Sequence, residues 1–131
     1  MIHYTTIEQS KKLLKLGLST ASADMKWRNG NVDNLIHYTV PFPLEEFEFC
    51  DLEKDVPSWS LGALLEVMPK IPRVEFNLVL PGASEEPPYI AFDDCRENHQ
   101  VHLNFEGETP LEAAYNTVCW LLENGYIKPE L

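Results

Sequence analysis

The sequence predicts an α+β fold, in which an antiparallel sheet of three to five strands packs with about three helices. Strand patterns follow one another between residues 73 and 105 without a helical pattern between them, and parallel pairing would need longer crossover connections. Helical patterns lie before and after this strand region, which is the arrangement typical of α+β proteins. The chain has 131 residues, the usual length of one domain, so we expect a single domain spanning residues 1–131.

A first helix is predicted over residues 6–16. Capping-box patterns begin at Thr5 and at Thr6, and the side chains of such a box satisfy the free N–H groups of the first helical turn. Gly17 follows the apolar stripe and can adopt the left-handed conformation that ends many helices. We expect Leu18 to fold back against the helix after this glycine.

The following part of the chain has weaker signals. A short helical turn is predicted at residues 22–27, and residues 28–34 have the composition of a turn or loop. Residues 35–40 have the pattern of a strand. In the acidic segment 45–55, phenylalanine and glutamate alternate, which predicts a short edge strand with a solvated acidic face.

The central elements have a clearer periodicity. Leucines at helical spacing predict a helix over residues 58–68, which Pro57 and Ser58 open and later prolines bring to an end. Alternating apolar residues predict strands at 73–80 and 100–105, and residues 89–93 are predicted to form a further strand between them. These three strands should form an antiparallel meander.

The last helix begins with a capping box at Thr109, followed by Pro110 at the first helical position, where a missing N–H has no cost. It ends at Asn124 and Gly125. Its apolar stripe should pack on the last strand of the meander. The residues expected in this contact are Leu111, Ala114, Val118 and Leu122 of the helix and Val101, Leu103 and Phe105 of the strand.

The chain is acidic, with 21 acidic and 10 basic residues and a net charge of −11. Direct binding to nucleic acid requires a basic surface that releases counterions, so the sequence argues against this class of function. An anionic membrane surface is disfavoured for the same reason. The acidic charge favours solubility, and it would also attract a basic protein partner.

Three cysteines, Cys50, Cys95 and Cys119, occur without a CxxC pair. An odd number without this motif predicts reduced thiols rather than a disulfide framework or a zinc ribbon. The first residues lack the pattern of a signal peptide, and no stretch approaches the ~20 apolar residues of a membrane span. We therefore expect a cytoplasmic protein.

Several blocks spread along the chain carry a resemblance. They are Thr6–Leu14, Leu16–Leu18, Ala23–Met25, Pro57–Leu65, Met68–Pro69, Ala113–Tyr115, Val118–Leu122 and Gly125–Lys128. In this order they resemble a family of small proteins of unknown function from Bacteroidetes-type bacteria, often associated with phages or mobile elements. The resemblance implies a bacterial or phage setting. It carries no activity, ligand or catalytic residue with it.

The densest set of potential metal ligands lies between residues 93 and 102, where the candidates are Asp94, Cys95, His99 and His102. Imidazole combined with thiolate or carboxylate suits a divalent metal, and such a site would indicate a small metal-dependent hydrolase. However, residues three apart on one strand point to opposite faces, so the two histidines would not converge. The plainer interpretation is a polar turn between two strands, and we expect neither a metal nor another cofactor.

A catalytic interpretation of the same segment is weaker still. Cys95 with His99 or His102 would supply a nucleophile and a base, but the sequence shows no third group that orients the histidine. No nucleotide-binding glycine loop, nucleophile elbow or zinc-protease motif occurs. We therefore assign no catalytic residue from the sequence.

Three tryptophans, Trp27, Trp59 and Trp120, either close the core or mark a contact surface. We favour the core, because tryptophan is usually mostly buried even though it is also enriched at binding hot spots.

The preferred functional hypothesis is a non-enzymatic interaction protein, such as an adaptor or an inhibitor encoded by a mobile element. Small size, high acidity and the lack of a catalytic motif support it, and a nucleic-acid mimic that occupies a DNA-binding partner is one subtype. A solvated edge strand explains the acidic segment equally simply. The residues expected to contact a basic partner are Glu45, Glu46, Glu48, Asp51, Glu53 and Asp55.

Overall fold

The structure is a computed structural model that describes residues 3–28, 31–34, 55–82, 85–96, 98 and 100–129. Along this part of the chain, helices precede, separate and follow two runs of strands. In order, the elements are α1 (Ile7–Lys15), the 3-10 helix η1 (Thr20–Ser22), β1 (Met25–Arg28), β2 (Asn31–Asn34), β3 (Asp55–Ser58), α3 (Leu61–Glu66), β4 (Val74–Val79), β5 (Tyr89–Asp94), β6 (Val101–Glu106) and α4 (Pro110–Glu123).

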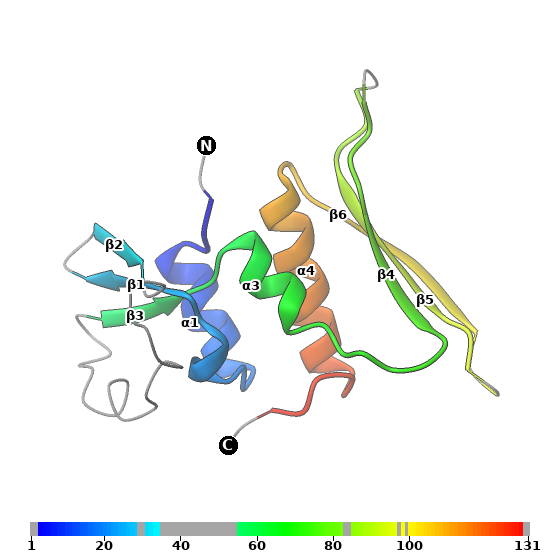
Figure 1. The fold of residues 1–131 in the computed structure, drawn as a ribbon, viewed down its shortest axis with the longest axis horizontal. Coiled ribbons are helices and arrows are strands. Elements are labelled where there is room, and N and C mark those ends of the chain that lie inside the picture. The colour runs from blue at the N-terminus through cyan, green and yellow to red at the C-terminus, as the bar shows by residue number, and fades with distance from the viewer. Residues whose placement is uncertain are drawn as a thin grey trace.

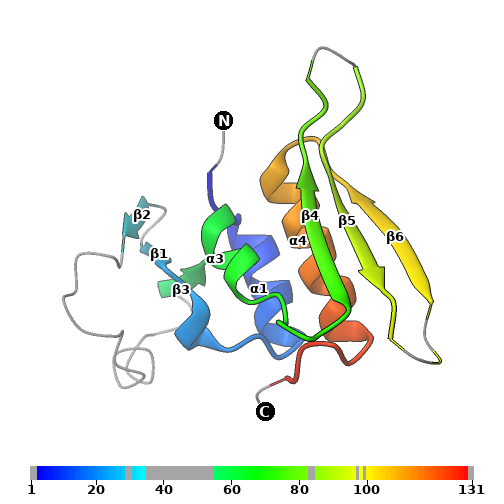
Figure 2. The same cartoon turned by 45° about the vertical axis from the view of Figure 1, so that its right-hand side comes forward.

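Helix α4 runs through the middle of the molecule and separates its two halves (Figures 1 and 2). A three-stranded antiparallel sheet in the order β4-β5-β6 covers one side of this helix. Helices α3 and α1 lie on its other side, followed by a second antiparallel sheet in the order β2-β1-β3. The predicted α+β class is confirmed.

The meander β4-β5-β6 forms as predicted, with ends within one or two residues of the expected strands. Its register places Phe76 opposite Phe92, and Phe92 opposite Leu103. Because side chains alternate between the faces of a strand, this row marks the inner face that α4 covers. Phe92 is completely buried there, with its ring 5.4 Å from that of Trp120 in α4.

Helix α4 packs on the sheet with a different side than the sequence suggested. Trp120 contacts Phe92 and Phe105, and the Asn116 side chain reaches the backbone of β6, so these positions mark the sheet-facing side. Val118 lies nearly half a turn round the helix from Trp120. It is fully buried on the side of the helix away from Trp120 and the sheet. A helix covered on two sides is apolar nearly all round, so its strongest stripe does not identify the sheet.

The end contacts of α1 are those that the sequence predicts. The Thr6 hydroxyl accepts a hydrogen bond from the Gln9 backbone N–H at 3.1 Å, and the Gln9 side chain accepts one from the Thr6 N–H at 3.0 Å. Gly17 has φ of 99°, a conformation that a side chain would disfavour. The Leu18 N–H then donates to the Leu13 C=O at 3.0 Å, which closes the helix end.

Buried hydroxyls fix α1 to β3. The Thr5 hydroxyl lies 2.7 Å from that of Ser10 and 3.2 Å from that of Ser58, and all three residues are fully buried. Ser58 also donates to the Thr5 C=O at 2.8 Å. Trp27 of β1 donates to the same carbonyl at 2.8 Å. A buried network with its donors and acceptors paired fixes one arrangement of helix and strand.

The predictions for the first half of the chain were partly wrong. Residues 22–27 were expected to form a helical turn, but the 3-10 helix ends at Ser22 and β1 begins at Met25. Residues 31–34 form β2 instead of a loop, and Pro57 lies in β3 instead of opening a helix. Helix α3 begins only at Leu61, after its cap residue Ser60. The strand expected at 35–40 lies outside the described residues.

Candidate functional site

The predicted metal segment contains a closed ion-pair cluster. Asp94, at the end of β5, is fully buried. Its carboxylate accepts hydrogen bonds from Nε of Arg96 at 3.0 Å and from Nη2 at 2.8 Å. The hydroxyl of Tyr126, which follows α4, donates to the same carboxylate at 2.8 Å. The cluster therefore ties the end of the chain to the sheet.

These contacts fix the charges of the cluster. The hydrogen bond from the Arg96 side chain holds the pKa of Asp94 well below its ordinary range, although burial acts in the opposite direction. The same hydrogen bond raises the pKa of Arg96. Burial, and then the hydrogen bond to Asp94, raises the pKa of Tyr126. Asp94 is thus an anion whose lone pairs are already engaged, which makes it a poor metal ligand.

The other metal candidates do not converge with Asp94. His102 lies opposite Asp93 on the outer face of the sheet, whereas Asp94 points to the inner face. Nδ1 of His102 is 2.5 Å from the Asp93 carboxylate, and both side chains are open to solvent. Cys95 is exposed at the end of β5. No group of three potential ligands is close enough for a metal in the described parts of the chain, and His99 lies outside them.

Cys119, the other cysteine among the described residues, offers no reactive site. Cys119 is buried in α4, and burial raises the pKa of its thiol. A thiol that stays protonated is a weak nucleophile, so Cys119 acts as a small core residue. Cys50 lies outside the described residues.

The acidic residues expected to contact a partner also lie outside the described ranges, apart from Asp55. These are Glu45, Glu46, Glu48, Asp51 and Glu53. Asp55 begins β3, with its backbone paired to Arg28 of β1. The predicted acidic contact surface therefore stays a prediction.

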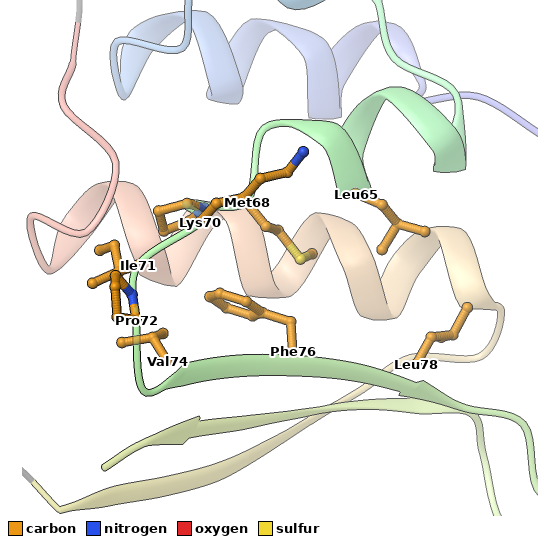
Figure 3. A pocket seen from close by; sticks show the side chains of 9 residues that line it. Leu65, Met68, Lys70, Ile71, Pro72, Val74, Phe76 and Leu78 are labelled. Atoms are coloured by element: carbon orange, nitrogen blue, oxygen red, sulfur yellow. The ribbon is translucent and has the colours of Figure 1, made fainter. Parts of the chain in front are cut away.

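An apolar groove of ≈ 630 Å³ lies between the end of α3 and strand β4. Figure 3 shows the side chains of the two elements facing one another across it. We call this feature the α3–β4 groove. Leu65 of α3 is 37 % exposed, whereas large apolar side chains are most often buried. The main apolar residues along the groove are Leu65, Met68, Ile71, Val74, Phe76 and Leu78.

The groove lies beside a free strand edge, because β4 is an outer strand of its sheet. The Arg73 C=O accepts a hydrogen bond from the Cys95 N–H at 2.9 Å. This bond fixes which residues of β4 direct their backbone groups towards β5 and which direct them away from it. Asn77 accordingly bonds to β5, whereas Phe76 and Leu78 direct their N–H and C=O groups away from it. Within the described residues, no hydrogen bond reaches these outward groups. We call them the open edge of β4.

The opposite edge of the sheet, on β6, is partly covered by a side chain of α4. On β6, the outward C=O of Glu106 accepts a hydrogen bond from the Asn116 side chain of α4 at 2.9 Å. Covering an edge in this way is one means by which proteins prevent unwanted strand pairing. Of the two edges, β4 is the one that lies along an apolar groove.

The outer face of β4 carries an unbalanced charge. Glu75 is exposed and lies directly opposite Asp93 of β5, which in turn lies opposite His102 of β6. Asp93 contacts His102, but the described residues place no basic partner beside Glu75. Like charges directly across a strand pair are destabilising. A basic group next to Glu75 would remove this penalty.

A second hollow, of ≈ 240 Å³, lies where α3 and α4 begin. Two of its polar side chains are engaged as helix caps, and the third is that of His3. The Ser60 hydroxyl accepts from the Ala63 N–H, and the Thr109 hydroxyl accepts from the Glu112 N–H, each at 3.2 Å. This hollow therefore presents few free groups to a ligand.

Comparison with known proteins gives no relative: no protein-family model matches the sequence, and no curated protein or solved structure matches it. The function therefore has to be argued from the molecule itself. Among the described helices, none has the length and apolar character needed to cross a membrane.

Sequence reasoning did not identify the α3–β4 groove. Leu65 and Phe76 each belong to an apolar stripe that the sequence shows clearly. These stripes predicted a helix and a strand, but apolar periodicity marks a face for burial without saying what covers it. Only the folded arrangement shows that part of each stripe remains open.

Proposed function

We propose that this chain is a non-enzymatic interaction protein that binds a partner protein at the α3–β4 groove. The observation that carries the proposal is the combination of an open apolar groove with outward backbone groups of β4 that no described residue pairs. Exposed apolar surface next to polar groups is typical of protein-binding sites. A large apolar side chain that becomes fully buried contributes about 1.5–3 kcal/mol, so two or three anchors are enough for measurable binding.

A basic partner fits this proposal, since the chain has a net charge of −11. An adaptor or inhibitor encoded by a phage or mobile element, acting in the cytoplasm, fits it as well. The acidic segment 45–55 would then be an additional contact surface.

The alternative function, a small metal-dependent hydrolase using the segment from Asp93 to His102, has one observation in its favour. Asp93 orients the ring of His102, as a carboxylate does in many catalytic sites. Against it, the side chain of His102 is 62 % exposed, and Asp94 is committed to Arg96. Catalytic proton transfer works best in a site that excludes water, so we prefer the interaction hypothesis.

A peptide-display selection tests the proposal. The wild-type protein is used to select binders from a random peptide library, and their affinities are then measured for Leu65→Glu and Leu103→Glu. Leu65 is 37 % exposed and Leu103 is 36 % exposed. Leu103 lies on β6, the edge strand of the sheet opposite β4. A charge in the groove should weaken binding by about tenfold or more. Leu103→Glu should bind like the wild type.

Circular dichroism would establish that both variants remain folded. The proposal fails if the library yields no binder. It also fails if the two variants bind the selected peptides equally well.

A further inference from the structure

We infer that the occupant of the groove is an extended segment of a basic partner protein, which pairs with β4 as a fourth strand of the sheet β4-β5-β6. This inference rests on the proposed function and specifies the binding mode. Three observations carry it: the backbone of β4, the groove beside it, and the charge on the outer face.

The backbone provides the pairing groups. Phe76 and Leu78 each present one N–H and one C=O at the open edge of β4, on alternate residues as a new antiparallel strand requires. A helix placed in the groove would leave these groups to water. An extended segment satisfies them, and strand addition to a free sheet edge is an established mode of peptide recognition.

The groove provides room for the side chains. An added strand would lie ~4.8 Å from β4, and alternate side chains would point to the inner face of the sheet. Phe76 and Leu78 point to that face and line the groove together with Leu65 of α3. Every second side chain of the partner would therefore enter the groove, and an apolar residue fits there best.

The outer face specifies the charge of the other side chains. The row Glu75–Asp93–His102 runs across the three strands, and it begins at the open edge of β4 with an acid. A lysine or arginine opposite Glu75 would relieve its repulsion with Asp93. The expected pattern of the partner is therefore an alternation of basic and apolar residues.

A second copy of this chain fits less well. Two β4 strands related by a two-fold axis at Asn77 would place Glu75 opposite Val79, so the acid would gain no basic neighbour. Each copy also carries a net charge of −11, and the two chains would repel one another.

The test uses two synthetic peptides of about ten residues. One alternates lysine with valine, and its twin alternates glutamate with valine. Binding to the wild-type protein is measured by fluorescence anisotropy, and amide hydrogen exchange is followed residue by residue. The lysine peptide should bind, and it should slow exchange at Phe76 and Leu78. Exchange at Asn77 should change little, because its N–H already bonds to β5.

Two matched pairs of variants separate backbone pairing from side-chain contact. Leu78→Pro removes the outward N–H without breaking a bond to β5, since proline is tolerated at such edge positions. Leu78→Ala removes the same side chain but keeps the N–H. The proline variant should bind the lysine peptide up to about tenfold more weakly than the alanine variant. Glu75→Lys should reverse the preference between the two peptides, by roughly threefold or more.

The outcomes distinguish this inference from the proposed function. If display-selected peptides bind and depend on Leu65, but exchange at Phe76 and Leu78 is unchanged, the groove binds a helix or another shape and the strand model is wrong. Equal binding by Leu78→Pro and Leu78→Ala would also overturn it. A peptide preference unaffected by Glu75→Lys would refute the basic pattern. If no peptide of any kind binds, the proposed function itself fails.

Discussion

Gly107 sets the distance between the large sheet and its helix, and replacing it with alanine is the sharpest test of this packing. The residue follows β6 directly and lies against the start of α4. A Cβ atom at this position would lie 2.4 Å from the Ala113 nitrogen and 2.7 Å from the Glu112 carbonyl carbon. Both are backbone atoms of the helix, so neither can rotate away as a side chain would.

The size of the effect follows from this geometry. Non-bonded carbon contacts are optimal near 3.5–4.0 Å, so the helix or the strand end would have to move by about 1 Å. Overpacking of this kind typically costs ~1–3 kcal/mol, and a backbone clash belongs at the upper end of that range. For a chain of this length each kcal/mol corresponds to about 3–6 °C in melting temperature. Gly107→Ala should therefore lower the melting temperature by roughly 10 °C.

A thermal melt followed by circular dichroism measures this, with Gly82→Ala as the matched control. A Cβ at Gly82 would meet no atom within 4 Å. That variant should melt within about 2 °C of the wild type, since alanine in an open loop mainly reduces the entropy of the unfolded chain. If Gly107→Ala melts like Gly82→Ala, the close approach of strand end and helix does not exist in solution.

Three further outcomes are expected. Val118→Asp should lower the free energy of unfolding by about 3 kcal/mol or more in a urea titration, because it buries an unpaired charge between α4 and its neighbours, and a wild-type midpoint would contradict this. The lowered pKa of Asp94 stabilises the fold above the ordinary aspartate value of about 4, and this contribution is lost as pH falls below that value. Wild-type stability should therefore fall more steeply on acidification than that of Asp94→Asn, and equal slopes would refute the assignment. Zinc equilibration followed by dialysis should leave no bound metal, whereas stoichiometric retention that disappears in His102→Ala would favour the hydrolase.

The elements predicted correctly are those whose signals are local. Thr6 and Gln9 cap α1 through each other, and they are only three residues apart in sequence. Pro110 marks the start of α4 in the same local way. The meander was predictable because β4 and β6 alternate apolar and polar residues along most of their six positions, while β5 between them begins with four apolar residues in a row.

The small sheet was missed because its strands are short and mostly polar. Each has four residues, too few for a period of two to stand out. β3 pairs with β1 across more than 25 positions of sequence, so no local pattern indicates the contact. Pro57 is predicted to open a helix, but proline is also tolerated in an outer strand such as β3. One usable signal was Asn29-Gly30, a dipeptide that favours two-residue hairpins.

The candidate site was beyond sequence reasoning for a different reason. The ion pair of Asp94 with Arg96 is local, but Tyr126 joins it from 32 positions away. The sequence therefore gives no sign that this carboxylate is already engaged in hydrogen bonds from two other side chains. In the same way, the sequence shows that Leu65 and Phe76 are apolar, but it cannot show that they face one another across an open space.

The open edge of β4 is defined at its start by the chain that precedes it. Arg73 has φ of 68°, a conformation unusual for a residue with a side chain. There the Val74 N–H turns back to the Ile71 C=O at 3.0 Å, so this N–H is not available to a partner strand. The first outward N–H of β4 that no described residue pairs is therefore that of Phe76, where the groove runs alongside. The pairing groups and the groove lie along the same part of β4. A partner strand therefore has one register in which it bonds to Phe76 and Leu78 and also places side chains in the groove. In that register, Glu75 favours a basic side chain opposite it on the outer face.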